Sequence, residues 1–181
     1  MNRFYNHYND IGLYDICMKT NCTNTHKIPR ISKIILNMGV KDVVSDKRRI
    51  LPALLSLEMI TGQRALITKS RKPLMSLKIR KGMVTGCKVV LRKSLMYNFL
   101  DKFITITLPR IKNFDGFQRM LVTNNGNISF RIKEPLSFFE LEYEYDKFRE
   151  LPPLDITLVT TGVNREEGLA VLSSFQFPFV K

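Results

Sequence analysis

The charge pattern between Glu58 and Asp101 is the feature that most constrains what this chain can fold into. The stretch holds ten lysines and arginines and no acidic residue. Six of the ten fall in TKSRKPLMSLKIRKG, residues 68–82. Like charges at this density repel one another, so we expect an exposed segment whose partner supplies the negative charge. The alternative is a solvated loop whose lysines only aid solubility.

The composition of the whole chain also indicates a polyanionic partner. Its 181 residues fit one domain, and a hydrophobic fraction of 44% is sufficient for a core. Lysines and arginines number 29 against 16 aspartates and glutamates, which gives a formal net charge of +13. A membrane is the weaker candidate for the anionic partner, because no apolar run approaches the ~20 residues of a spanning helix.

Helical and strand patterns interleave along the sequence. Apolar spacing predicts helices over residues 4–19, 45–62, 94–109 and 164–175. Alternating or β-branched runs predict strands over residues 31–40, 64–68, 86–92, 127–132 and 154–162. These patterns predict an α+β fold in which helices pack on one face of a mostly antiparallel sheet, with long basic and acidic loop insertions. We expect a single domain over 1–181, in which 1–28 form an N-terminal helix and a connector.

Two helix starts can be predicted at the level of single residues. The second helix should be capped by Ser45 or Asp46 and should stop at the glycine of TGQ. Pro52 lies inside this helix, and because a mid-helix proline costs ~3 kcal/mol, we expect a kink or a later start. The last helix should open on Asn164 and Glu167, which have capping-box spacing.

The sequence contains no motif that indicates catalysis. It has neither a Walker phosphate-binding loop nor a G-x-G-x-x-G dinucleotide site, and its two histidines are not in H-E-x-x-H. Cys17 and Cys22 lack a matching second pair of metal ligands. Cys87 is either a thiol activated by its lysine neighbour or an inert core thiol, and we favour the core thiol. The alternating glutamates of residues 140–144 are typical of one solvated strand face. We therefore predict no catalytic site, metal or cofactor.

RNA binding is the chemistry that the sequence does support. Five cations can each neutralise a phosphate, giving salt-dependent affinity: Arg71, Lys72, Lys78, Arg80 and Lys81. Gly82 and Gly86 would let the backbone approach a ribose-phosphate chain. Asn37 and Gln63 could hydrogen-bond base edges or 2′-hydroxyls, the groups that mark RNA. The alternative is an RNA-processing or RNA-modifying enzyme with a basic face.

Five segments resemble a known ribosomal family. They are PRISKIILNMGV, DKRRILPALLSLEMITGQRALITKSRKPLMSLKIRKGMVTGCKVVLR, ITITLPRI, LDITLVTTGVNREEG and FPFVK. In order and spacing they resemble large ribosomal subunit protein five, the family that binds 5S rRNA, from near residue 5 to residue 181. Val90 departs from the threonine that is common there, and Pro52 replaces a good helix former.

The resemblance implies a structural, non-enzymatic protein of the large-subunit central protuberance. It implies contacts to 5S rRNA from Asn37, Met38, Gly39, Gln63, Thr68, Lys69 and Arg71. It implies that a loop reaches peptidyl-site tRNA through Lys78, Arg80, Lys81 and Gly82. It implies an intersubunit bridge to a basic small-subunit head protein through Glu142, Glu144, Asp146 and Glu150. Large-subunit rRNA and other large-subunit proteins complete the expected partners, with no membrane and no small-molecule substrate.

The acidic segment and the overall composition leave two alternatives open. Residues 134–155 carry a net charge of −5 and are either that protein-facing surface or a solvated hairpin rim. Residues with A- and T-rich codons (Asn, Ile, Lys, Phe and Tyr) make up 62 of the 181, as in many organelle genomes. The first twenty residues do not resemble a transit peptide. We predict an organelle-encoded protein of the mitochondrial ribosome, with the cytoplasm of an AT-rich bacterium as the alternative.

Overall fold

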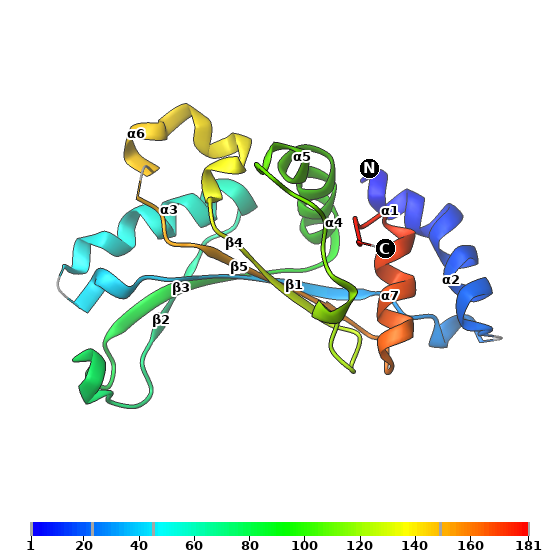
Figure 1. Ribbon diagram of the computed structural model, residues 1–181, viewed down its shortest axis with the longest axis horizontal. Helices are drawn as coiled ribbons and strands as arrows, with labels where there is room; N and C mark the ends of the chain where they lie inside the picture. The colour runs from blue at the N-terminus through cyan, green and yellow to red at the C-terminus, as the bar shows by residue number, and fades with distance from the viewer. Residues whose placement is uncertain (1, 23, 45, 149, 181) are drawn as a thin grey trace. The chain divides into compact units, whose positions relative to one another are not determined.

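The computed structural model describes residues 2–22, 24–44, 46–148 and 150–180 (Figure 1). Five strands form one sheet in the order β2-β3-β1-β5-β4. Their bounds are β1 Ile31–Gly39, β2 Leu66–Lys69, β3 Val84–Leu91, β4 Ile128–Ile132 and β5 Leu154–Thr160. The antiparallel β2–β3 pair and the helices between the strands confirm the predicted α+β class with a mostly antiparallel sheet.

The helices fall close to the predicted ranges. The α-helices are α1 Arg3–His7, α2 Leu13–Thr20, α3 Ile50–Thr61, α4 Lys93–Lys102, α5 Leu108–Arg110, α6 Tyr145–Phe148 and α7 Arg165–Ser174. A π-helical segment, η1 (Tyr8–Gly12), joins α1 to α2, and a second one, η6 (Phe103–Thr107), joins α4 to α5. The helices predicted over residues 4–19 and 94–109 are therefore confirmed, each with one widened turn inside it.

Helix α3 starts later than its sequence pattern suggested. The Asp46 carboxylate accepts a hydrogen bond from the Arg48 N–H at 3.2 Å and caps a short 3₁₀ turn, η4 (Lys47–Arg49). The α-helix begins at Ile50, so Pro52 falls in its first turn, where a backbone N–H has no helical acceptor to lose. The expected later start is confirmed, and Ser45 lies outside the described residues.

The chain divides into two compact units. Unit 1 consists of residues 1–34, 91–130 and 157–181, and unit 2 consists of residues 35–90 and 131–156. Each unit is built from segments that are far apart in the sequence. That the whole chain acts as a single domain stays a prediction.

Phenylalanines form much of the core of unit 1. Phe103 stacks on Phe99 with ring centroids 5.8 Å apart, and Phe130 stacks on Phe103 at 5.5 Å. Phe117 contacts Phe130 at 4.4 Å and Phe177 at 4.8 Å. Ring pairs at these separations add to the burial of apolar area, so this cluster joins the helix α4–η6, strand β4 and the C-terminal residues.

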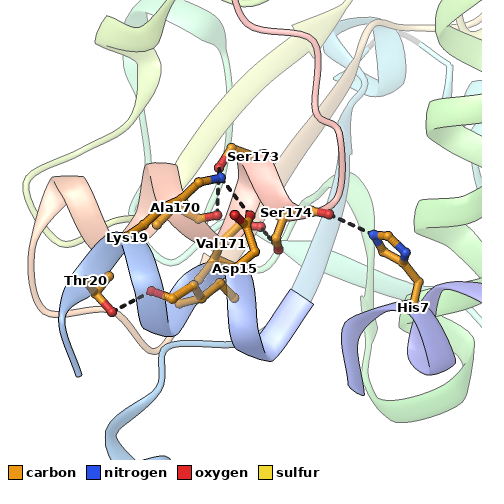
Figure 2. Close-up of polar contacts among 9 residues, drawn as sticks. His7, Asp15, Lys19, Thr20, Ala170, Val171, Ser173 and Ser174 are labelled. Carbon is orange, nitrogen blue, oxygen red and sulfur yellow. Dashed lines mark hydrogen bonds and ion pairs between the residues drawn. The ribbon is translucent and has the colours of Figure 1, made fainter. Parts of the chain in front are cut away.

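Polar contacts join α1 and α2 to α7 within unit 1 (Figure 2). Lys19 Nζ donates to the Asp15 carboxylate at 2.7 Å and to Ser173 Oγ at 3.0 Å. His7 Nε2 lies 3.0 Å from the carbonyl oxygen of Ser174. The two exposed bonds of Lys19 are individually weak, so they align helices whose packing is supplied by apolar side chains.

The start of α7 differs from the predicted capping box. The Asn164 side chain makes no capping hydrogen bond. Instead Glu167 Oε2 accepts a hydrogen bond from the Val163 N–H at 2.9 Å. The predicted cap is wrong by one residue, because the glutamate reaches past Asn164 to the preceding backbone.

A tight turn packs against the same end of α7. Gly126 has φ 72°, and the Thr160 hydroxyl donates to its carbonyl oxygen at 3.0 Å. A Cβ added to Gly168 of α7 would overlap the Gly126 Cα and carbonyl oxygen and would lie 2.8 Å from its carbonyl carbon. Two backbones therefore touch where a side chain on either residue would hold them apart.

Unit 2 places α3 against strands and against the acidic segment. Leu57 and Ile60 of α3 and Leu36 of β1 are buried. The acidic segment contains two 3₁₀ helices, η8 (Pro135–Ser137) and η9 (Phe139–Glu144), followed by α6, and η9 and α6 both contact α3. The strand face predicted from the alternating glutamates is wrong, because Phe138, Leu141 and Phe148 are buried at spacings of three and seven, which is a helical period.

Candidate nucleic-acid interface

Strands β2 and β3 form a hairpin that carries the basic stretch. Thr68 lies opposite Gly86, and the register shifts by a bulge between Thr68 and Lys69. Beyond the bulge the pairing continues, since the Ser70 N–H donates to the Met83 carbonyl at 2.8 Å. The basic stretch is therefore an ordered extension of a hairpin. Figure 1 shows this hairpin in green, with the loop at its free end.

The tip of the hairpin is closed by a second, smaller pairing. Leu74 and Ile79 exchange both backbone hydrogen bonds, at 2.9 and 3.0 Å. Lys78 and Gly82 take left-handed φ values of 54° and 81°. Met75 at the tip is 96% exposed. Backbone bonds thus shape the loop while its side chains point to solvent.

All six basic side chains of the stretch are exposed. They are Lys69, Arg71, Lys72, Lys78, Arg80 and Lys81. Within the part of the chain that the structure describes, none of the six forms an ion pair. Their charges are available to a ligand, and clustered cations of this kind attract polyanions. The projecting hairpin therefore has the electrostatics that the sequence predicted.

The end of β1 brings two of its three predicted RNA contacts to the surface. Asn37 is half-buried and Gly39 is exposed, whereas Met38 is fully buried. The Ser56 hydroxyl donates a hydrogen bond to the Met38 sulfur at 3.5 Å inside unit 2. Met38 therefore belongs to the core of unit 2 and is not open to a ligand.

The two glycines expected to admit RNA have different surroundings. Gly86 is buried, and a Cβ there would overlap the Met38 carbonyl oxygen. It is needed for the close approach of β3 to β1 rather than for contact with RNA. A Cβ at Gly82 would meet nothing within 4 Å, so its glycine serves the positive φ of the turn and leaves the surface open.

Gln63 and Thr68 lie on either side of the start of β2, and both are half-buried. The Gln63 N–H donates to the Thr61 hydroxyl at 3.3 Å, and the Thr68 carbonyl accepts from the Thr85 hydroxyl at 3.4 Å. These bonds use backbone atoms. Among the described residues neither polar side chain has a hydrogen-bond partner, so both remain available to a ligand.

Two further exposed cations of unit 2 were not among the site residues predicted from the sequence. Arg64 precedes β2, and Lys88 lies on β3 opposite Leu66. Cys87 and Val89 on either side of Lys88 are buried, so strand alternation turns Lys88 to the opposite face. Lys88 could have been predicted as a site residue, because it is a single charge inside an otherwise apolar strand.

The four acidic residues assigned to a protein contact lie close together. Glu142 and Glu144 belong to η9, Asp146 belongs to α6, and Glu150 follows α6. Glu144 is half-buried and accepts from Lys147 Nζ at 3.1 Å, while the other three are exposed. This surface repels phosphate and is chemically opposite to the hairpin.

Cys87 on β3 is an inert core thiol. It is fully buried, and burial raises the pKa of its thiol to about 11. Because the thiolate is the reactive form, a thiol activated by Lys88 is excluded and the core interpretation is confirmed.

This burial predicts selective alkylation. Iodoacetamide at pH 8 should modify Cys17 and Cys22, which are half-buried, in the folded protein. Cys87 should react only after unfolding, because its pKa of about 11 keeps it protonated and its surroundings exclude the reagent. Peptide mass spectrometry before and after denaturation measures this. Reaction of folded Cys87 at the rate of Cys17 would contradict its placement.

The described ranges hold neither a metal-binding cluster nor a membrane-spanning helix. No group of three or more His, Cys, Asp or Glu side chains there is placed to hold a metal ion, and no helix there is long and apolar enough to cross a membrane. A hollow of about 280 Å³ in unit 1 is lined by apolar side chains and Gln176. Its lining offers no acid, base or nucleophile for catalysis.

The fold and this surface define a class: basic α+β proteins that present unpaired cations to a polyanion. Comparison with known proteins narrows the class. The family model described as ribosomal protein L5 matches residues 24–80, and the model for the C-terminus of the same ribosomal family matches residues 84–179. The large ribosomal subunit protein uL5m of Reclinomonas americana is 45% identical over 181 residues, which are 100% of both chains. The chain belongs to the ribosomal protein L5 family.

Family membership fixes the general function. The family is a structural, non-enzymatic component of the large ribosomal subunit, so the alternative of an RNA-processing enzyme is excluded. Ribosomal RNA and other ribosomal proteins are its partners. The relative is a mitochondrial ribosomal protein, which confirms the predicted mitochondrial location over a bacterial cytoplasm.

Proposed function

We propose that this protein binds 5S rRNA in the central protuberance of the large subunit. The contacts are Asn37, Gly39, Gln63, Thr68, Lys69 and Arg71, whereas the buried Met38 is left out. The observation that carries the proposal is the β2–β3 hairpin, with six exposed cations that have no ion-pair partner among the described residues. Phosphates can neutralise these charges, and the polar side chains beside them can recognise 2′-hydroxyls.

Hydroxyl-radical footprinting of 5S rRNA with the isolated protein tests this contact. One RNA helix should be protected, and the protection should disappear when Lys69, Arg71 and Lys72 are replaced by alanine. Protection that survives in this variant, or that spreads evenly over the RNA, would count against the proposal.

The tip of the same hairpin is proposed to contact peptidyl-site tRNA. Its residues are Lys78, Arg80, Lys81 and Gly82. Lys78 lies beyond the Leu74–Ile79 bridge, and Arg80, Lys81 and Gly82 follow the bridge on the returning arm, where the Gly82 N–H donates to the Ser70 carbonyl at 2.9 Å. In this proposal one RNA binds near Thr68 and Lys69 at the base of the hairpin, while another meets the side chains nearer its tip.

This division predicts separable losses. Changing Lys78, Arg80 and Lys81 together to alanine should weaken peptidyl-site tRNA retention about tenfold, as expected for three exposed charge contacts. Binding to 5S rRNA should stay nearly intact. Filter binding of tRNA to purified ribosomes and titration of 5S rRNA measure the two activities.

A matched control removes three positive charges that lie outside the hairpin tip. Arg92, Lys112 and Lys133 are exposed, and their triple alanine variant should leave tRNA retention unchanged. If the tip variant loses both RNA activities together, the hairpin holds one site instead of two.

The acidic segment is proposed to face a basic protein of the small-subunit head in an intersubunit bridge. Its contacts are Glu142, Glu144, Asp146 and Glu150. Exposed ion pairs contribute only ~0.2–1 kcal/mol each, which suits a contact that shifts as the subunits rotate. The concentration of carboxylates on one short segment of a basic chain supports this proposal.

Reversing these four charges tests the bridge. The lysine variant should weaken subunit association at low magnesium at least about tenfold, because four attractions become repulsions. Assembly of the large subunit should be normal by sedimentation. Asp10→Lys with Asp115→Lys, two exposed positions in unit 1, serves as the control. Failed assembly with normal association of the remaining particles would show that the segment is structural.

A further inference from the structure

Helix α3 has apolar side chains on its outer side as well as on its inner side. Leu57 and Ile60 are buried on the inner side. Leu51, Leu55 and Met59 are 54%, 47% and 38% exposed. Because residues four apart lie above one another on a helix, these three form one continuous stripe. We call it the outer stripe.

The helix also lacks the charges that a solvent-facing helix carries. From Ile50 to Thr61 its one charged residue is Glu58. The Glu58 carboxylate accepts a hydrogen bond from the Ala65 N–H at 3.0 Å, so it serves the local fold. A helix that is apolar on all sides is ordinarily covered on all sides. The exposed outer stripe thus has the composition of a contact surface.

The segment that contacts α3 adds aromatic rings and carboxylates. Tyr143 of η9 is 88% exposed and Tyr145 of α6 is 54% exposed. Asp146 beside them is exposed too. Figure 1 shows α6 and α3 as neighbours, in agreement with their contacts. Within unit 2, apolar and aromatic side chains therefore lie next to negative charge.

We propose that the outer stripe, with Tyr143 and Tyr145, is a docking surface for another ribosomal protein. The docking segment of that protein carries apolar and basic side chains together. The segment that contacts α3 carries carboxylates, which repel phosphate, so an RNA helix does not match this surface. Lysines and arginines on a protein segment complement it, and they select the partner while the apolar contact supplies affinity.

The inference rests on the proposed function in one respect, namely that the acidic segment faces protein. The inference adds to the proposed bridge an apolar contact, which is made by the outer stripe of α3. The two ideas can fail separately, because the bridge is tested by reversing carboxylates and the docking surface is tested by changes on α3 alone.

Photo-crosslinking in assembled ribosomes tests the inference. Benzoylphenylalanine in place of Leu55 or Met59 should crosslink to a protein peptide that is both basic and apolar. The same group in place of Lys78 should crosslink to RNA, as the proposed function requires. Crosslinks from Leu55 and Met59 to RNA, or none from either in ribosomes that contain the protein, would overturn the docking surface.

A second variant checks that the stripe contributes affinity. Leu51→Gln, Leu55→Gln and Met59→Gln together should reduce binding of the crosslinked peptide at least tenfold and change 5S rRNA binding less than twofold. Leu66→Gln with Ile67→Gln, which are also exposed, is the control and should bind the peptide normally. Unchanged peptide binding by the stripe variant would also overturn the inference. If the charge-reversal variant associates normally while these results hold, the bridge fails and the docking surface stands.

Discussion

Raising the salt concentration fourfold should weaken binding of the isolated protein to 5S rRNA about 60- to 1,000-fold. If about five phosphates are neutralised, each releases condensed counterions, and log affinity should fall against log salt with a slope of about −3 to −5. In our proposal the source of this dependence is Lys69, Arg71 and Lys72 of the hairpin together with the neighbouring exposed cations Arg64 and Lys88. Fluorescence anisotropy with labelled 5S rRNA between 50 and 200 mM KCl measures the slope.

Charge removal should change the slope in proportion. Lys69→Ala, Arg71→Ala and Lys72→Ala together should make it shallower by about 2 to 3, since each lost phosphate contact removes about one unit. Glu142→Gln with Asp146→Asn should leave it unchanged, because these side chains face protein in our proposal. Salt-insensitive binding, or equal affinity for random duplex RNA, would refute the interface.

Gly168→Ala should lower the free energy of unfolding by about 3 kcal/mol or more. The new Cβ would overlap backbone atoms of Gly126, which cannot move aside as the end of a flexible side chain can. Gly126 is itself fixed by its positive φ and by the bond from Thr160. For a chain of this length the loss corresponds to a fall of about 6–12 °C in melting temperature, measurable by circular dichroism.

The matched control for this change is Gly39→Ala. Its new Cβ would meet nothing within 4 Å, and its φ is not left-handed. Its melting temperature should stay near that of the wild type, since glycine and alanine in a strand differ by roughly 0.5–1 kcal/mol. Equal melting temperatures for the two variants would contradict the prediction, because they would show that the turn at Gly126 can move away from α7 without loss of stability.

The regular elements could be predicted because burial imposes a period on the sequence. In β4, Ile128, Phe130 and Ile132 are buried and alternate with exposed neighbours, as the pattern NISFRI predicted. The same reasoning failed for the glutamates of residues 140–144. Their period of two came from charge, whereas the buried residues Phe138, Leu141 and Phe148 follow a helical period and decide which side is buried.

The charges of the candidate site were visible in the sequence, but their geometry was not. Burial of Met38 depends on which face of β1 meets α3, which the residues NMG do not specify. The need for Gly86 depends on how closely β3 approaches β1, and the shift after Thr68 depends on the hairpin register. Such tertiary distances cannot be read from local patterns.

The register shift in β2 has a consequence for the protein before it meets RNA. β2 is the last strand at one edge of the sheet, and Leu66 and Ile67 on it are exposed. An edge of this kind can pair with the same edge of a second copy and begin self-association. The bulge bends the strand after Thr68, and Lys69 then places a positive charge at the point where a second copy would continue the ladder. The bulge and Lys69 thus disfavour pairing between two free chains at this edge, and in our proposal the RNA that binds the hairpin would cover the same edge.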